Sequence, residues 1–206
     1  MSPRLALTVA VALFATAVGV SFLASVELVL VTVVYLAVQL AYCWGLKHQP
    51  VLDISIVASG FVLRAIAGGA AAGIVLSQWF LLTTAFGALF MVAGKRYAEL
   101  QLAERTGAKI RKSLERYTAS YLRFVWTLSA TGVIMTYSLW AFQLSQTNHT
   151  RWPVISLVPF VLAILRYALD VDEGNGGEPE QIILSDRMLQ ALGGCLTLTF
   201  IAAVYL

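Results

Sequence analysis

Long apolar runs alternate with short polar breaks along this chain of 206 residues. About 20 apolar residues at 1.5 Å each cross the hydrocarbon core of a bilayer as a helix. The runs are continuous rather than alternating, which excludes a transmembrane barrel. The pattern therefore predicts an all-α, polytopic transmembrane bundle with spans at 5–26, 28–44, 53–73, 79–94, 117–144, 152–169 and 188–206.

The polar breaks predict where successive spans turn. Glu27 marks a very short turn between the first two spans, and Pro50 lies in the break GLKHQPVLD after the second. The stretch DVDEGNGGEPEQ is expected to form a solvated acidic loop. Its carboxylates Asp170, Asp172 and Glu173 could bind a divalent ion, but the ligand pattern of a calcium loop is not completed.

The longest polar interval, Gly94 to Thr118, holds seven of the fourteen Lys and Arg residues and only three acidic residues. Residues 97–105 within it have the pattern of an amphipathic helix, which Gly107 is expected to end. Lys95, Arg96 and Glu99 lie within about one helical turn and can converge on one site.

Arg111 and Lys112 form a second basic pair in the same interval, just before the fifth span. Guanidinium forks and ammonium groups suit phosphate oxygens, so the two clusters could hold a ligand with phosphates at two ends. The alternative is a topology anchor that contacts anionic lipid headgroups.

Positive charge gathers on one side of the predicted membrane. If the spans alternate, eleven of the fourteen Lys and Arg residues fall on the side of the N-terminus, which marks that side as cytoplasmic. The loops after the second, fourth and sixth spans then share this face. We expect a multi-pass protein of the cell inner (plasma) membrane whose active face is cytoplasmic.

Four polar residues stand in or beside the second and third spans. Arg64 lies near the middle of the third span, where a charge costs about 2.5–3.5 kcal/mol on insertion scales. Asp53 lies eleven residues earlier, about 16 Å away, so the two do not pair directly. Either a polar cavity has Asp53 at its mouth and Arg64 deeper, or Arg64 pairs with another helix. Tyr42 and Lys47, at the end of the second span, have the pattern of an interfacial belt.

Composition restricts the class further, with 59% hydrophobic residues, 12% charged residues and a net charge of +3. These values leave no room for a soluble domain, so one transmembrane domain is expected over residues 1–206. Cys43 and Cys195 are expected to be buried free thiols. His48 and His149 fall on opposite sides of the membrane, so a histidine metal site is not expected. The chain has no nucleophile–base pair, zinc motif, Walker loop or dinucleotide fingerprint.

Three stretches together resemble one known family. They are AYCWGLKHQPVLDI with IVASGFVLRAIAGG, then the stretch from FGALFMVAGKRYAEL to LSATGV, and finally AILRYALDVDEGNGGEPEQIILSDRMLQ. They are similar to the decaprenyl-phosphate phosphoribosyltransferases of the UbiA prenyltransferase superfamily. The resemblance implies part of a nine-helix intramembrane fold around a central cavity. It also implies transfer of 5-phosphoribosyl from phosphoribosyl diphosphate to decaprenyl phosphate with Mg²⁺, toward the arabinose donor of the cell wall.

The resemblance also implies roles for individual residues. Lys95 and Arg96 would neutralise the departing diphosphate, Glu99 would reach a metal ion or ribose hydroxyls, and Tyr97 would pack on the sugar. Lys47 resembles the phosphate-binding Lys of a Tyr-x-x-x-Lys element, although its spacing from Tyr42 is one residue longer. The remaining candidates, for the lipid phosphate or the 5-phosphate, are Arg111 and Lys112.

The chain departs from the superfamily pattern in two places. The segment GKRYAEL carries Glu99 where many relatives carry aspartates, which agrees with the phosphoribosyl branch rather than with prenyl diphosphate users. The motif Asn-Asp-x-x-Asp-x-x-x-Asp is absent from the chain, which affects the expected activity. We therefore expect that the first two helices and the main Mg²⁺ site are missing, and that the chain alone is inactive or nearly so. A catalytically inactive scaffold, another UbiA-type prenyltransferase and a seven-helix transporter or receptor are the alternatives. A homo-oligomer is left open, and no nucleic-acid partner is expected.

Overall fold

The computed structural model describes residues 2–107, 113–175 and 179–205, and within these ranges it is helical with no strand. The chain divides into two compact units, Met1–Leu76 and Ser77–Leu206, and each is described by itself. The expectation of one domain over residues 1–206 stays a prediction.

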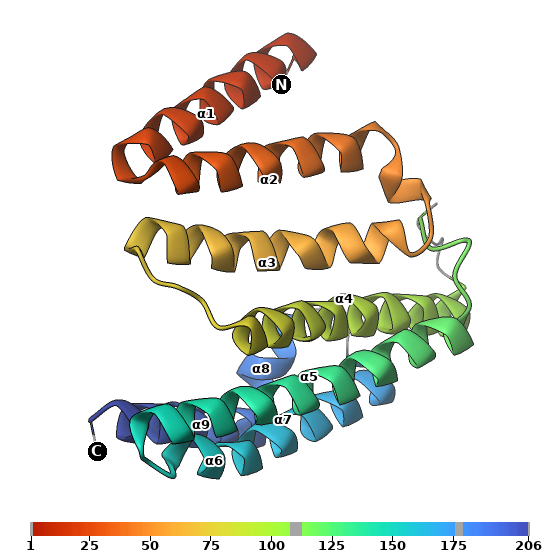
Figure 1. Cartoon of the computed structure of the whole chain (residues 1–206). Helices are drawn as coiled ribbons and strands as arrows, with labels where there is room; N and C mark the ends of the chain where they lie inside the picture. Colours follow the sequence, from red (N-terminus) through yellow and green to blue (C-terminus); the bar gives the residue numbers. More distant parts are fainter. Residues whose placement is uncertain (1, 108–112, 176–178, 206) are drawn as a thin grey trace. The chain divides into compact units, whose positions relative to one another are not determined.

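The first unit is a series of antiparallel helices joined by tight turns (Figure 1). α1 (Pro3–Ala24) packs on α2 (Val26–Trp44), and α2 packs on α3 (Leu52–Ala72). A single 3₁₀ turn, η1 (Leu46–His48), connects α2 to α3. The hydroxyl of Ser25 accepts from the Leu28 backbone N–H at 3.0 Å and donates to the Ala70 carbonyl at 3.2 Å, which fixes the start of α2.

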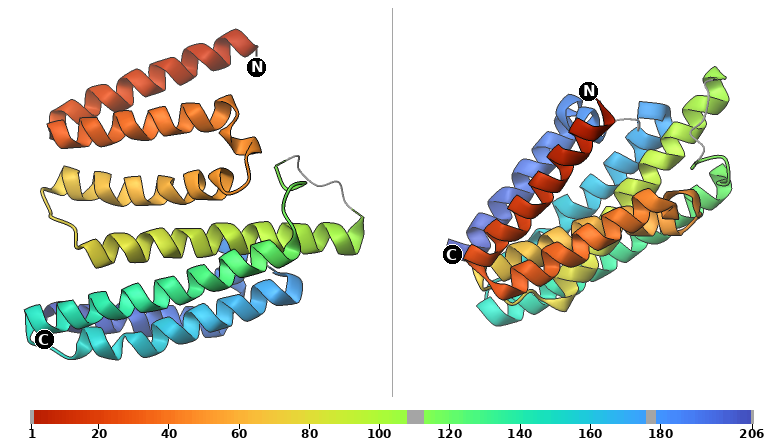
Figure 2. Two further views of the ribbon diagram at one scale, coloured as in Figure 1. Left: turned by 45° about the vertical axis from the view of Figure 1, so that its right-hand side comes forward. Right: turned by 90° about the horizontal axis from the view of Figure 1, so that it is seen from above.

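The second unit is built on two long helices that lie side by side, α4 (Gln78–Thr106) and α5 (Ala119–Asn148) (Figures 1 and 2). After α5 come α6 (Trp152–Ile155), α7 (Leu157–Asp170), the π-helical turn η2 (Val171–Asn175), α8 (Pro179–Ser185) and α9 (Arg187–Tyr205). α9 packs mainly on α7 and α6, while α5 connects this layer to α4.

Two predicted boundaries are corrected. The turn between the first two spans lies at Ser25 rather than at Glu27. Glu27 belongs to the first helical turn of α2, where a carboxylate complements the positive end of the helix dipole. The fourth span does not end at Gly94. It continues without a break to Thr106, and Gly107 ends it in the left-handed conformation at φ 69°, as predicted.

The prediction of a solvated loop for the acidic stretch is also wrong. Its described residues form η2 and α8, and Asp170 is buried at the end of α7. The sixth span is interrupted at Ser156, between α6 and α7. The buried Ser156 hydroxyl hydrogen-bonds with Tyr137 at 2.7 Å and donates to the Pro153 carbonyl at 2.6 Å, which satisfies polar groups at the break.

The membrane class is confirmed by the helices. Among the described residues, five helical segments are long and apolar enough to cross a bilayer, and they comprise α1, α2, α3, α5 and the stretch from α6 to η2. α9 is apolar but shorter, and α4 has a polar second half. Many large apolar side chains are exposed on these helices, as expected of surfaces that face lipid. Cys43 and Cys195 are free but exposed, which corrects the expectation of buried thiols.

Aromatic rings fill the core between α4, α5 and α7. Phe90 and Tyr97 both stack on Trp126, with ring centroids 5.8 and 5.6 Å apart, and Phe90 also contacts Tyr167 at 5.6 Å. Gly94 admits the indole, because a Cβ there would lie 3.0 Å from Trp126 Nε1. These contacts tie the polar second half of α4 to the body of the unit.

A second glycine allows an even closer approach of α4 and α5. A Cβ at Gly132 would lie 2.5 Å from the Phe86 ring, whereas one at Gly87 would meet Val133 at an ordinary 3.5 Å. We expect Gly132→Ala to lower the unfolding free energy by about 1–3 kcal/mol through overpacking. Gly87→Ala should raise it by roughly 0.5–1 kcal/mol, because alanine favours a helix interior. Unfolding of both variants in detergent micelles measures the contrast, and equal effects would contradict this packing.

Candidate functional site

The cation-rich face of α4 carries Lys95, Arg96 and Glu99 just beyond the core aromatics. Arg96 Nη1 lies 3.8 Å from Glu99 Oε2, and these side chains are only 12% and 18% exposed. Lys95 is half-buried and forms no ion pair with any residue that the structure describes. A half-buried ammonium group without a counter-ion attracts an anionic ligand, because desolvation strengthens its field.

Tyr97 lies on a different face of the same helix. Two residues along an α-helix correspond to a rotation of about 200°, so Lys95 and Tyr97 do not share a face. Tyr97 is 1% exposed and its ring stacks on Trp126. Its ring face is therefore covered by protein, and its hydroxyl is the polar group that this side chain offers.

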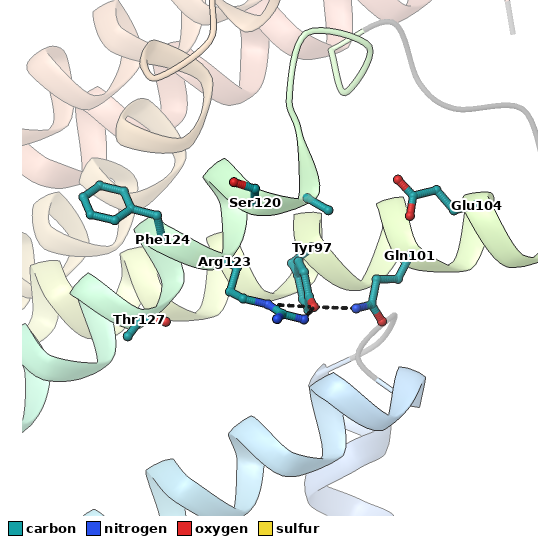
Figure 3. A pocket seen from close by; sticks show the side chains of 8 residues that line it. Tyr97, Gln101, Glu104, Ser120, Arg123, Phe124 and Thr127 are labelled. Carbon is teal, nitrogen blue, oxygen red and sulfur yellow. Dashed lines mark hydrogen bonds between the residues drawn. The ribbon is translucent and has the colours of Figure 1, made fainter.

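The Tyr97 hydroxyl is the centre of a polar network on the α4–α5 side (Figure 3). It accepts hydrogen bonds from the guanidinium group of Arg123 and from Gln101 Nε2, and donates to Asp172 Oδ1 at 3.2 Å. Arg123 Nη2 also lies 3.6 Å from Asp172 Oδ1. A hydroxyl has one proton and two lone pairs, so this arrangement uses its whole capacity. The network joins α4, α5 and η2.

A cavity of about 600 Å³ opens beside this network between α4 and α5. Tyr97, Gln101, Glu104 and Arg123 line its polar end, and Phe124 and Thr127 extend it along α5 (Figure 3).

Sequence reasoning missed Arg123 and Asp172 as members of one network. Arg123 was placed inside a span and Asp172 in a loop, 49 positions apart in the numbering, and nothing local connects them. The signal that could have found them was charge balance. An Arg in the first turns of a span needs an acidic or hydroxyl partner, and the stretch DVDE offers a group of carboxylates.

A second arginine neutralises the other carboxylates of this region. Arg166 Nη2 lies 3.5 Å from Asp170 Oδ1, and Arg166 Nε donates to Asp186 Oδ2. The Arg166 hydrogen bond lowers the pKa of Asp186 below its ordinary value; burial acts against this, and the backbone N–H groups of Met188 and Leu189 add to it. The Arg166–Asp186 pair ties α7 to the junction of α8 and α9. Of the carboxylates that had suggested a divalent-ion loop, Asp170 is paired with Arg166 and Asp172 with Arg123.

In the first unit, Tyr42 and Asp53 are direct partners. The Tyr42 hydroxyl donates to Asp53 Oδ1 at 2.8 Å, and Asp53 is 1% exposed. This bond clamps the end of α2 to the start of α3 across η1. Lys47 is half-buried in η1 itself and forms no ion pair within the described ranges. The clamp therefore fixes the backbone that presents Lys47.

Arg64 and Tyr42 line a cavity of about 260 Å³ between α2 and α3. Arg64 Nη2 donates to Tyr35 Oη at 3.0 Å, and its guanidinium lies 5.6 Å from the Tyr35 ring and 5.1 Å from the Phe61 ring. No carboxylate pairs with Arg64 in the described part of the chain. Aromatic faces and a hydroxyl thus stabilise this intramembrane charge.

Arg111 and Lys112 lie outside the described residues. The remaining candidates fall into two groups by unit, with Tyr42, Lys47, Asp53 and Arg64 in the first and Lys95, Arg96, Tyr97 and Glu99 in the second. Among the described residues, no three His, Cys, Asp or Glu side chains are placed to bind a metal ion together. These residues do not fit the Mg²⁺ that the resemblance implies, so no chemical step is derived through it.

Comparison with known proteins decides the family. Residues 1–191, which extend across both units, match the UbiA prenyltransferase family. The chain belongs to the UbiA prenyltransferase family. The multi-pass helical architecture is that of the family. One helix of this bundle, α4, carries Lys95, Arg96 and Glu99.

Several curated relatives are similar over almost the whole chain. Proteins named decaprenyl-phosphate phosphoribosyltransferase from Corynebacterium glutamicum, Mycolicibacterium smegmatis and Mycobacterium tuberculosis are 60%, 61% and 60% identical to it. The matches cover 96%, 90% and 97% of this chain and 60%, 61% and 66% of the respective relatives. The chain of this UbiA family member thus spans about 60–66% of their length.

The Tyr97 network makes a testable contribution to the stability of this UbiA family member. We expect Tyr97→Phe to lower the unfolding free energy by about 1 kcal/mol, because it removes hydrogen bonds of Arg123, Gln101 and Asp172 while keeping the ring stack. Tyr205→Phe is the matched control, since Tyr205 is 82% exposed. Unfolding in detergent micelles measures both, and a loss no larger for Tyr97→Phe than for the control would show that the network adds no stability.

The Arg166–Asp186 pair predicts how stability depends on pH. The folded-state pKa of Asp186 is lowered, so its stabilising effect is present above the unfolded pKa near 3.8 and is lost as pH falls through the folded value. We expect Asp186→Asn to lower the thermal midpoint at pH 7 and to differ progressively less from wild type below pH about 4. Thermal scans between pH 3 and pH 7 measure this, and a pH-independent difference would contradict it.

Proposed function

We propose that this chain takes part in the transfer of 5-phosphoribosyl from phosphoribosyl diphosphate to decaprenyl phosphate. The observation that carries the proposal is the 60% identity over 96% of this chain to a relative with that printed name. The half-buried Lys95 and Arg96 support it, because they supply the cations that a sugar diphosphate requires.

The chemistry assigns distinct tasks to these groups. An oxygen of the lipid phosphate forms a bond to the anomeric carbon of ribose, and the bond from that carbon to the diphosphate oxygen breaks. Negative charge grows on the departing diphosphate, so a fixed cation beside it stabilises the transition state more than the ground state. The lipid phosphate is already a nucleophile, so the reaction needs no strong general base.

The residues are assigned as follows. Lys95 and Arg96 bind the diphosphate, and Glu99 orients Arg96 through their ion pair and faces the ribose hydroxyls. Tyr97 acts through its hydroxyl network, which holds this half of α4 in place. Lys47, held by the Tyr42–Asp53 clamp, is a phosphate contact from the first unit, and Arg111 and Lys112 remain candidates for the lipid phosphate or the 5-phosphate. Arg64 lines a separate polar cavity.

The same proposal includes the cellular setting. The basic face of α4 lies on the cytoplasmic side of a bacterial inner membrane, because positively charged residues collect on that side. The product then feeds synthesis of the cell-wall arabinose donor. Mg²⁺ is the cofactor implied by the family resemblance, and among the described residues no three His, Cys, Asp or Glu side chains are placed to hold it together.

A binding measurement tests the assignment of Lys95. We expect Lys95→Ala to weaken binding of phosphoribosyl diphosphate to the 206-residue chain in nanodiscs by about ten- to hundredfold, as removal of a charged hydrogen bond does. Arg151→Ala is the matched control, because Arg151 is exposed beyond the opposite end of α5. Equal affinities for Lys95→Ala and wild type would exclude Lys95 from the phosphate site.

The same nanodiscs, supplied with decaprenyl phosphate and radiolabelled phosphoribosyl diphosphate, measure transfer. We expect labelled lipid to form far more slowly than with the longer relatives, because the described residues offer no metal-binding cluster. Binding without any transfer would favour the catalytically inactive scaffold. A rate equal to that of the longer relatives would show that the chain is catalytically sufficient.

A further inference from the structure

The cavity of about 600 Å³ between α4 and α5 carries one charge on each of its two walls. Arg123 on α5 brings a guanidinium group, and Glu104 on α4 brings a carboxylate to which the proposed transfer gives no task. Both residues are exposed, so a ligand can reach them from outside the protein. A ligand that complements this cavity carries a negative and a positive group at once.

Arg123 keeps hydrogen-bonding capacity for a ligand beyond its contacts inside the protein. Its Nε and Nη2 groups donate to the Tyr97 hydroxyl, and Nη2 lies 3.6 Å from Asp172 Oδ1. A guanidinium group has five N–H donors, and the two on Nη1 have no hydrogen-bond partner among the described residues. The side chain is also 61% exposed. Phosphate oxygens are the acceptors that match such a free guanidinium edge.

Glu104 supplies the opposite charge, about one helical turn beyond the hydroxyl network. It follows Gln101 by three residues, about 4.5 Å along α4, and Gln101 donates to the same Tyr97 hydroxyl as Arg123. The Glu104 carboxylate forms no ion pair with any residue that the structure describes. It repels a ligand that is only anionic, such as a sugar diphosphate, and attracts an ammonium group. Charge therefore distinguishes this cavity from the diphosphate site proposed at Lys95.

The cavity lies near one end of a membrane-spanning helix. Arg123 is four residues, about 6 Å, from the start of α5 at Ala119, and α5 is long and apolar enough to cross a bilayer. Phe124 and Thr127 extend the cavity along this helix (Figure 3). Phe124 is 62% exposed, and Leu128, one turn further, is 53% exposed. Charged groups at the end of a span, followed by an exposed apolar face, are what a phospholipid headgroup and its acyl chains require.

We propose that this cavity binds the headgroup of phosphatidylethanolamine, with the phosphate on Arg123 and the ammonium group on Glu104. Two carbons join these groups in the lipid, and its primary ammonium donates three hydrogen bonds, as that of lysine does. Phosphatidylcholine has the same charges but no N–H donor, and phosphatidylglycerol lacks the positive charge. Both therefore bind the cavity more weakly. The bound headgroup links α4 to α5, and this inference goes beyond the proposed function and does not depend on it.

Photolabelling of the full chain tests the proposal. The probe is a phosphatidylethanolamine with a photoreactive group on one acyl chain close to the glycerol, added to the chain in phosphatidylcholine nanodiscs. We expect labelled peptides from the first half of α5, next to the cavity. Glu104→Gln should reduce labelling about tenfold, because it removes a charge-assisted hydrogen bond. Glu115→Gln is the matched control, since Glu115 is exposed on the same side of α5 and does not line the cavity.

Competition identifies the chemistry and the source of the ligand. Excess unlabelled dioleoyl phosphatidylethanolamine should abolish labelling, whereas the same excess of dioleoyl phosphatidylglycerol or of soluble phosphoethanolamine should leave most of it. Equal displacement by phosphatidylglycerol would overturn the ethanolamine assignment, and displacement by phosphoethanolamine would overturn the assignment to a lipid. Phosphoribosyl diphosphate should leave labelling unchanged, and displacement by it would show that the cavity belongs to the substrate site instead.

Charge reversal at the same position gives a second, independent test. Glu104→Lys replaces the acceptor of the ammonium group with a cation, so phosphatidylglycerol should become the stronger competitor in this variant. Glu104 is exposed, so neither of its substitutions disturbs the packed core. An unchanged order of competitors in Glu104→Lys would overturn the proposal, and so would labelling that Glu104→Gln and Glu115→Gln reduce equally.

Discussion

The continuity of α4 is the constraint on which the second unit depends. α4 is 29 residues long and runs from its apolar first half into the basic interval without a break. The packing of the apolar half therefore fixes the direction in which each side chain of the basic half points. The Phe90 and Tyr97 rings stack on Trp126 on one side of α4. Lys95 and Glu99 lie on another side of the same helix. Because residues two apart on a helix point in nearly opposite directions, the motif GKRYAEL serves two faces at once.

This division of faces assigns different physical tasks to neighbouring residues. On the Lys95 face, Arg96 is paired with Glu99, whereas Lys95 forms no ion pair with a described residue and suits an anionic ligand. The Tyr97 face is neutralised internally, since Arg123 is matched by Asp172 and the tyrosine hydroxyl. A polar network whose hydrogen bonds are made within the protein adds rigidity rather than affinity. The first face is therefore the better candidate for chemistry, and the second for holding α4 in position.

The sequence predicted most of the helical pattern because hydropathy and helix-ending glycines are local signals. Gly107 ended α4 as expected, and apart from the end of the fourth span and the break at Ser156 the span bounds were predicted within a few residues. What failed depended on tertiary contacts. The acidic stretch looked solvated because the partners of Asp172 and Asp186 lie in distant segments, Arg123 on α5 and Arg166 on α7. Cys43 and Cys195 looked buried because apolar helices that face lipid have the same composition as helices that face a core.

The glycines of the second unit show why a feature made by a missing side chain is hard to infer from a sequence. Gly87 and Gly193 line one apolar cavity, and their helices α4 and α9 are far apart in the chain. A glycine inside a helix costs about 0.5–1 kcal/mol relative to alanine, so each needs a compensating reason. At Gly132 the reason is close approach to Phe86. At Gly193 no described atom lies within 4 Å of the missing Cβ, so packing among the described residues gives no such reason.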